Sequence, residues 1–247
     1  MKISIITVCY NSAETIEATI RSVLDQDYQN IEYIIVDGKS TDKTMSVIEK
    51  YKSRIAQIIS EKDDGLYFAI NKGIRTATGD VIGILHADDF YAGKNVISRV
   101  MKEFSGKNID SVYGDLQYVA KNDPQKIIRN WKSGDFWAEN FLKGWMPPHP
   151  AFFVKRKCYE QYGAFNTMFS FSADYELMLR FLFKHKITAS YIPEVLVKMR
   201  TGGKSNVSFK NRMNANKEDR LAWKINGLKP GKFTLLLKPL SKLKQFI

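Results

Sequence analysis

The sequence predicts an α/β fold in which helices cover both faces of a mostly parallel β-sheet. Short runs rich in β-branched residues alternate, along the first half of the chain, with segments that repeat apolar residues at helical spacing. The strand-like runs are apolar at nearly every position, which is typical of strands buried on both faces. Such alternation indicates parallel strands joined by crossover helices. The 247 residues are enough for one large domain.

The first half of the chain is expected to contain four strands and three helices. Ser12 is expected to cap the first helix, and Ser40 or Thr41 the second, because short polar side chains satisfy the free N–H groups of a first turn. The strands are expected at residues 3–10, 31–36, 55–59 and 81–85, and the helices at residues 12–27, 40–51 and 66–76.

The second half mixes strands, helices and a rigid loop. A turn at residues 121–124 separates two strands, and prolines bracket His149 in the loop 145–150. A short aromatic segment, residues 136–142, lies between them. The strands are expected at residues 110–119, 126–131, 151–154 and 190–199, and the helices at residues 95–104, from 173 onwards and at 207–225.

The composition is that of a globular protein with a basic C-terminal part. Hydrophobic residues make up 44% and charged residues 26%, and the formal net charge of +12 is concentrated in residues 198–244. The two cysteines form neither a disulfide framework nor a metal-ligand pattern. No window reaches the roughly 18 consecutive apolar residues of a transmembrane helix, and the apolar start is interpreted as a strand, not a signal peptide. We therefore expect a cytoplasmic protein, peripheral on the inner face of the cell membrane.

The last residues, 229–247, combine lysines with leucine and phenylalanine. This composition is that of a segment at an anionic membrane surface. The alternative is a terminal helix docked on its own domain with its lysines in water.

Acidic residues follow three of the predicted strands. Because ligands of parallel sheets bind beyond the carboxyl ends of the strands, we expect these side chains to face one site. Two adjacent carboxylates after a buried strand suit Mg²⁺ or Mn²⁺ that bridges a substrate diphosphate. The alternative is that the pair caps a helix or lies in a solvated turn. The acidic residues are Asp37, the pair Asp63 and Asp64, and the pair Asp88 and Asp89.

Four stretches together resemble the family-2 glycosyltransferases of the GT-A fold. They read I-S-I-I-T-V-C-Y-N-S, V-D-G-K-S-T-D-K-T, D-D-G-L-Y-F-A-I-N-K-G and A-T-G-D-V-I-G-I-L-H-A-D-D. The similarity is dense over residues 2–92 and thinner beyond. It implies a Rossmann-like GT-A domain at 1–205, with a nucleotide-sugar-binding half (1–92) and an acceptor half (93–205) that carries the acceptor-side helices. Residues 206–247 then form a basic helical appendage.

The resemblance also implies roles for individual residues on the donor side. Asp37 would hold the nucleoside, and Asp63 and Asp64 the base or ribose. Asn71 and Lys72, with Tyr67, lie about one helical turn apart and would share a face toward the donor. Asp88 would bind the metal and the diphosphate, and Asp89 the metal. His86 stands where the family often has Asn, and would donate a hydrogen bond or join the metal shell.

On the acceptor side, inverting transfer needs a general base that takes the proton of the acceptor hydroxyl. Asp174 matches the family's base, although Ala173 stands where many members have a second acid. The alternative is that Asp174 only caps a helix. His149 would contact the donor diphosphate or the acceptor, or have a packed structural role. Arg200 and Lys204, beside the glycine pair at 202–203, would receive a diphosphate.

The resulting prediction is a glycosyltransferase that moves a sugar, with inversion, from a nucleotide-sugar donor to a glycan or polyprenyl-linked saccharide. A UDP-sugar is favoured, and Mg²⁺ or Mn²⁺ is the expected cofactor. The alternatives are a non-catalytic nucleotide-sugar-binding protein, or a basic protein that binds membranes or nucleic acid. No helix-turn-helix, zinc or RNA-binding signature supports nucleic acid as a partner. A nucleotidyltransferase is disfavoured because no Gly-, Arg- and Lys-rich phosphate loop lies near the N-terminus.

Overall fold

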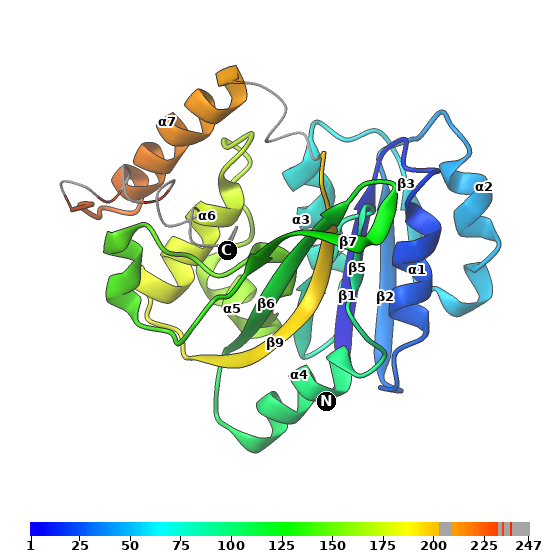
Figure 1. The fold of residues 1–247 in the computed structure, drawn as a ribbon, viewed down its shortest axis with the longest axis horizontal. Coiled ribbons are helices and arrows are strands. Elements are labelled where there is room, and N and C mark those ends of the chain that lie inside the picture. The colour runs from blue at the N-terminus through cyan, green and yellow to red at the C-terminus, as the bar shows by residue number, and fades with distance from the viewer. Residues whose placement is uncertain (203–208, 232–233, 235–237, 239–247) are drawn as a thin grey trace.

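One nine-stranded sheet organises the chain in a computed structural model, which describes residues 1–202, 209–231, 234 and 238 (Figure 1). Eight strands follow the order β3-β2-β1-β4-β8-β6-β9-β5, and β7 pairs with β6. The first-half strands pair in parallel; they are β1 (Ile3–Cys9), β2 (Ile31–Asp37), β3 (Gln57–Ser60) and β4 (Val81–Ile84).

The second half extends the sheet with both kinds of pairing. β8 (Phe152–Lys155) runs antiparallel between β4 and β6 (Ser111–Ala120), and β6 pairs in parallel with β9 (Ala189–Arg200). β5 (Asp89–Tyr91) and β7 (Asp123–Trp131) are antiparallel to β9 and β6 respectively. The predicted α/β fold is confirmed: the first-half strands pair only in parallel, and the second half mixes parallel and antiparallel pairs.

Helices cover the sheet on both faces (Figure 1). In the first half these are α1 (Ile16–Leu24), α2 (Thr44–Glu49) and α3 (Leu66–Thr76), with the 3-10 turn η1 (Lys52–Arg54). In the second half they are α4 (Val96–Gly106), α5 (Arg156–Tyr162), α6 (Ala173–Met178), which continues as the π-helix η4 (Leu179–Lys184), and α7 (Phe209–Ile225). The 3-10 turns η2 (Ala138–Lys143) and η3 (His149–Ala151) complete the set.

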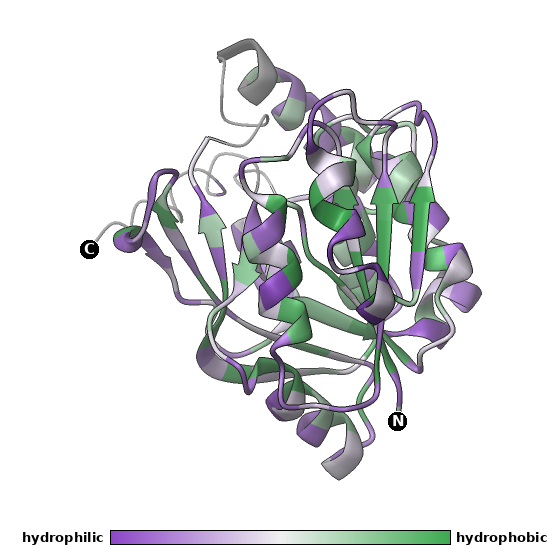
Figure 2. Ribbon diagram, turned by 90° about the vertical axis from the view of Figure 1, so that its right-hand side faces the viewer, coloured by the Kyte–Doolittle hydropathy of each residue, from purple (hydrophilic) through white to green (hydrophobic). Residues whose placement is uncertain are grey.

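The core lies between the sheet and these helices. All seven residues of β1 are buried, and the parallel strands appear green along most of their length in Figure 2. Gly73 lets α3 approach β1 closely, because a Cβ at this position would clash with the Ile6 side chain. This contact brings the first turns of α3 beside the carboxyl ends of the strands. Within the described residues, no helix is long and apolar enough to cross a membrane.

Several local predictions differ from the structure. α2 begins at Thr44, so Ser40 and Thr41 do not cap it, and the Ser40 hydroxyl donates to Asp37 instead. α1 begins at Ile16, four residues after the predicted Ser12 cap, and the Ser12 hydroxyl donates instead to the Tyr10 carbonyl. Residues 89–91 form a strand, β5, that pairs with β9, and residues 156–162 form the helix α5. Both were missed, because three residues are too few to show a period and because the apolar positions of residues 156–162 follow no clear helical stripe.

Candidate active site

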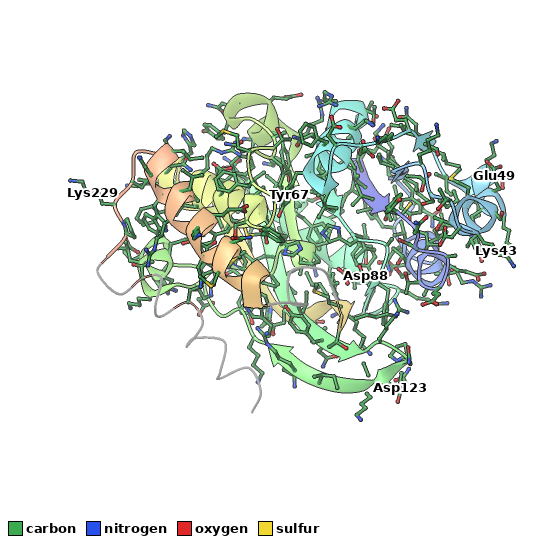
Figure 3. All side chains as sticks on the ribbon, turned by 90° about the horizontal axis from the view of Figure 1, so that it is seen from above. Lys43, Glu49, Tyr67, Asp88, Asp123 and Lys229 are labelled. Atoms are coloured by element: carbon green, nitrogen blue, oxygen red, sulfur yellow. The ribbon has the colours of Figure 1, made fainter. Side chains whose placement is uncertain are left out.

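A cleft of about 1050 Å³ lies at the carboxyl ends of β1, β2 and β4. Residues that follow these strands form one wall, and residues from the second half of the chain form the other. Figure 3 shows Tyr67 and Asp88, which both line the cleft, near the middle of the molecule. Of the predicted site residues, the cleft brings together Asp63, Asp88 and Asp174, with His86 and His149 beside them.

A smaller pocket of about 370 Å³ adjoins the cleft and shares Lys62 and Asp63 with it. The predicted donor-side residues Asp64, Asn71 and Lys72 line this pocket and not the main cleft. The residues that are predicted to bind the donor therefore line two adjoining cavities.

Asp37 is fully buried at the end of β2. One carboxylate oxygen accepts a hydrogen bond from the Ser40 hydroxyl (2.5 Å), and the other accepts from the Ser60 hydroxyl (2.7 Å) and the Ser40 N–H (3.1 Å). Asp37 is not part of the cleft wall, whereas the next residues, Gly38 and Lys39, are. In this structure Asp37 shapes the turn that presents Gly38 and Lys39, and its contact with a nucleoside stays a prediction.

Lys72 bridges two carboxylates at the base of α3. Its ammonium lies 2.6 Å from Asp63 and 2.5 Å from Glu61. The second oxygen of Asp63 is buried and has no hydrogen-bond partner within the described part of the chain. Asp63 therefore keeps one acceptor atom for a ligand.

Asn71 joins the two halves of the chain across the cleft. Its amide donates to the Phe165 carbonyl (2.7 Å) and accepts from the Phe165 N–H (2.9 Å), and the Tyr67 ring stacks on Phe165 at 5.7 Å. These bonds fix the segment between α5 and α6 on α3. A contact between Asn71 and the donor stays a prediction.

The adjacent carboxylates Asp88 and Asp89 occupy different environments. Asp88 lines the cleft. Asp89 is fully buried outside it, and neither of its carboxylate oxygens has a hydrogen-bond partner in the described residues. Burial, and then the charge of Asp88, raise the pKa of Asp89 well above its usual value, which favours the neutral carboxyl. Asp89 is not part of the cleft wall, and its predicted ligation of a metal stays a prediction.

The cleft offers protein side chains that could bind a divalent cation. No group of three or more His, Cys, Asp or Glu side chains within the described residues is arranged to hold a metal alone. Mg²⁺ that is shared with a nucleotide diphosphate needs only one or two protein carboxylates, since phosphates and water fill the other positions. Asp88 supplies one hard oxygen donor at the cleft, so this site fits a cation that arrives with a diphosphate.

Asp174 and His149 form a pair in the cleft wall. The Nδ1 atom of His149 lies 3.1 Å from Oδ2 of Asp174, and the His149 ring meets the His86 ring edge-on at 5.4 Å. Burial alone would raise the pKa of Asp174, but the charge and hydrogen bond of His149 outweigh it, with help from Lys238, and lower the pKa to about 2. Burial and then His149 lower the pKa of His86 to about 4, so His86 is neutral at neutral pH.

Arg200 lies behind the cleft. It is largely buried, donates to the Asp88 carbonyl (2.8 Å), and places its guanidinium 4.8 Å from the centroid of the Phe90 ring. These contacts hold the backbone of the Asp88 segment, and its predicted contact with a diphosphate stays a prediction. Lys204, the other predicted diphosphate ligand, lies outside the described residues.

Sequence reasoning missed that α7 holds α6, the helix that carries Asp174, and the segment before it. The Glu218 carboxylate accepts hydrogen bonds from three successive N–H groups, those of Ser170 (3.0 Å), Phe171 (2.8 Å) and Ser172 (2.8 Å). Farther along α7, the Trp223 indole donates to the Tyr175 hydroxyl, and the Asn226 amide donates to Glu176. These bonds flank Asp174 on both sides. The sequence signal was the apolar run Leu221, Ala222 and Trp223 near the end of a largely polar helix.

Comparisons with known proteins agree with this architecture. A sequence model described as "Glycosyl transferase family 2" matches residues 4–173. An uncharacterised glycosyltransferase of Mycobacterium tuberculosis is 31% identical over 183 residues, which are 72% of this chain and 68% of that protein. The UDP-Glc:alpha-D-GlcNAc-diphosphoundecaprenol beta-1,3-glucosyltransferase of Escherichia coli is 34% identical over 139 residues, 52% of this chain and 53% of that one.

Solved structures share the fold. TarS of Staphylococcus aureus superposes with a TM-score of 0.72 at 16% identity, over 97% of this chain and 71% of that one. The mannosyltransferase of Pyrobaculum calidifontis, in complex with GDP-Man and Mn²⁺, superposes with a TM-score of 0.67 at 21% identity, over 98% and 69% of the two chains. The motifs, the sheet and the family match lead to one conclusion: the chain is a glycosyltransferase of the GT-A fold and belongs to glycosyl transferase family 2.

Proposed function

We propose that the enzyme transfers a sugar from a nucleotide-sugar donor to a hydroxyl of a glycan or polyprenyl-linked saccharide, with inversion at the anomeric carbon. The observation that carries this proposal is that the Asp174–His149 pair and Asp88 line the same cleft from the two halves of the chain. A single carboxylate beside a site for a diphosphate is what one-step displacement requires, because the base and the leaving group act on opposite faces of the sugar.

In the reaction, the acceptor oxygen attacks the anomeric carbon while the bond from that carbon to the nucleotide diphosphate breaks. Asp174 takes the hydroxyl proton. A carboxyl with a pKa of about 2 is a weak base. It suffices because the hydroxyl becomes strongly acidic as its oxygen bonds to the anomeric carbon. His149 holds the carboxylate in one orientation and helps to lower its pKa.

The leaving group carries negative charge that must be stabilised. Asp88 would hold Mg²⁺ or Mn²⁺, and such an ion supplies Lewis-acid stabilisation to a departing diphosphate. Lys39, Lys62 and Lys121 also line the cleft and add positive charge there. In this proposal, Asp37, Asp63 and Asp64 contact the nucleoside of the donor.

The donor proposal draws on relatives. TarS has been solved with UDP-GlcNAc and with UDP, and the E. coli relative is named as a UDP-Glc-dependent enzyme that acts on a diphosphoundecaprenol-linked sugar. We favour a UDP-sugar and a polyprenyl-linked saccharide for this chain. A cytoplasmic location at the inner face of the membrane, inferred from the net charge of +12, stays a prediction.

The test measures thermal stability of the wild type with UDP, GDP and CDP, each with and without Mn²⁺. It then follows nucleotide release from the matching sugar donor with a polyprenyl-diphosphate-linked GlcNAc acceptor. One nucleotide should stabilise the protein in the presence of metal, by ~2.7 kcal/mol at a hundred times its dissociation constant. Asp174→Asn should bind that nucleotide and fail to transfer the sugar. Full transfer by this variant would contradict Asp174 as the base.

A further inference from the structure

The β6–β7 hairpin lies at the edge of the sheet among the described residues. Ala120 pairs with Asp123, so that only Lys121 and Asn122 form the turn. Within the described residues, β7 pairs with β6 alone, and its register is irregular near Val119 and Ala120. In the described part of the chain, the other edge of β7 has no strand beside it.

This hairpin exposes a consecutive apolar pair among basic residues. Ile127 and Ile128 are 48% and 41% exposed. The register shift lies at this pair: Arg129 is opposite Tyr118 and Ile127 is opposite Val119, so Ile128 is the extra residue of a β-bulge. Residues 117–132 contain four basic residues and one acidic residue, Asp123. Lys121, Lys126 and Lys132 are exposed.

The hairpin is held rigidly beside the mouth of the cleft. The Arg129 guanidinium lies 4.6 Å from the Tyr118 ring centroid and 5.5 Å from that of Trp131, which stiffens the two strands. Lys121 lines the cleft and pairs with Glu14 at 3.4 Å. Figure 3 shows Asp123, at the hairpin turn, on the outer edge of the molecule.

We propose that the β6–β7 hairpin is a docking surface for an anionic lipid bilayer. The isoleucine pair would enter the boundary between headgroups and acyl chains, and the lysines would contact anionic headgroups. Docking there would bring the cleft mouth to the membrane in which a polyprenyl-linked acceptor is embedded. In this respect the inference rests on the proposed function.

Two other occupants fit the surface less well. A second copy pairing along β7 is opposed by the irregular register and by lysines on the edge, which are devices that prevent strand-to-strand association. Nucleic acid would use the positive charge but would leave the exposed Ile127 and Ile128 without a contact. A bilayer uses both features.

The experiment measures co-sedimentation of the full chain with vesicles of phosphatidylcholine alone and of phosphatidylcholine with phosphatidylglycerol. Ile127→Ser/Ile128→Ser should weaken binding to the anionic vesicles about tenfold or more. Lys126→Gln/Lys132→Gln should weaken it about 25-fold, since each lysine near such a surface contributes about fivefold. The matched controls, Met168→Ser/Met213→Ser and Lys43→Gln/Lys50→Gln, change exposed residues elsewhere and should bind like the wild type.

The nucleotide-induced rise in thermal stability separates this inference from the proposed function. It should be unchanged in every hairpin variant. Wild-type vesicle binding by both hairpin variants would overturn the docking surface while leaving the transferase proposal intact. A dimer in light scattering that is lost in Ile127→Ser/Ile128→Ser, with unchanged vesicle binding, would assign the surface to a second copy and would also overturn the inference.

Discussion

The Nδ1 atom of His149 lies 3.1 Å from the Oδ2 atom of Asp174 and joins a proline-bracketed turn to the first turn of α6. The two residues are 25 positions apart in the sequence, and the antiparallel placement of β8 in the sheet brings their elements together. His149 thereby orients the proposed base and is one of the groups that lower its pKa.

The first prediction concerns the pH dependence of transfer. His149→Gln removes the interaction that lowers the pKa of Asp174, so burial is left to raise this pKa from about 2. Because Asp174 must be ionised to act, the acidic limb of kcat/KM should move to higher pH, and kcat at neutral pH should fall by about tenfold. A pH–rate profile of wild type and variant checks this. An acidic limb that stays in place would show that His149 does not control the base.

The second prediction separates Asp88 from Asp89. Asp88→Asn should abolish the Mn²⁺-dependent part of the nucleotide-induced stabilisation, because it removes the carboxylate that faces the cleft. Asp89→Asn is the matched control; it changes a buried carboxyl outside the cleft and should keep the Mn²⁺-dependent part. Thermal unfolding with nucleotide, with and without Mn²⁺, measures both. Loss of the Mn²⁺-dependent part in Asp89→Asn, with its retention in Asp88→Asn, would assign the metal to Asp89 and exclude Asp88.

The third prediction concerns the bonds from α7 to the segment before Asp174. Glu218→Ala leaves three backbone N–H groups without their acceptor. We expect kcat to fall at least tenfold with the KM for the donor unchanged, because Asp174 loses its position while the donor side of the cleft is untouched. Steady-state kinetics in both substrates measure this.

Two variants control this result. Lys217→Ala changes the neighbouring exposed residue of α7 and should leave kcat unaffected. Glu218→Gln keeps one acceptor oxygen and should recover part of the loss. Equal losses in kcat and in the donor affinity of Glu218→Ala would point to general unfolding and not to positioning of Asp174.

Much of the first half could be predicted from the sequence, because local patterns decide it. The α3 bounds, residues 66–76, agree at both ends, since glycine precedes an amphipathic run that ends at a polar turn. The acids after the strands do gather at one edge. What the sequence could not show is the direction of each side chain. Asp37 turns into the structure and Asn71 toward Phe165, and only tertiary contacts decide this.

The second half was less predictable, because contacts between distant segments determine it. β5 exists only through its pairing with β9, and a three-residue segment carries no period of its own. The polar α7 was expected in an appendage after residue 205, whereas it packs on α6 through polar bonds that a hydrophobicity pattern does not reveal. The family resemblance predicted a role for Asp174. Its contact with His149 could be seen only in the folded structure.

The last prediction concerns the stability of the region behind Asp174. Arg180 forms a bidentate pair with the nearly inaccessible Glu176 (2.9 Å for both bonds) and donates to the Gly163 carbonyl (2.7 Å) and the Ala164 carbonyl (2.7 Å). Arg180→Met would leave the Glu176 carboxylate buried, with the Asn226 amide as its remaining side-chain partner among the described residues. Removing one partner of a buried pair typically costs about 3–5 kcal/mol.

Urea unfolding should therefore show a loss of this size for Arg180→Met, at an unchanged m-value. The double variant Arg180→Met/Glu176→Leu removes both charges and should recover most of the stability, because the main cost of the single variant is the unpaired buried carboxylate. Lys52→Met, which breaks the exposed pair with Glu49, is the control and should cost at most about 1 kcal/mol. If the double variant is no more stable than the single one, the bonds from Arg180 to the carbonyls of residues 163 and 164, and not its pairing with Glu176, hold this region together.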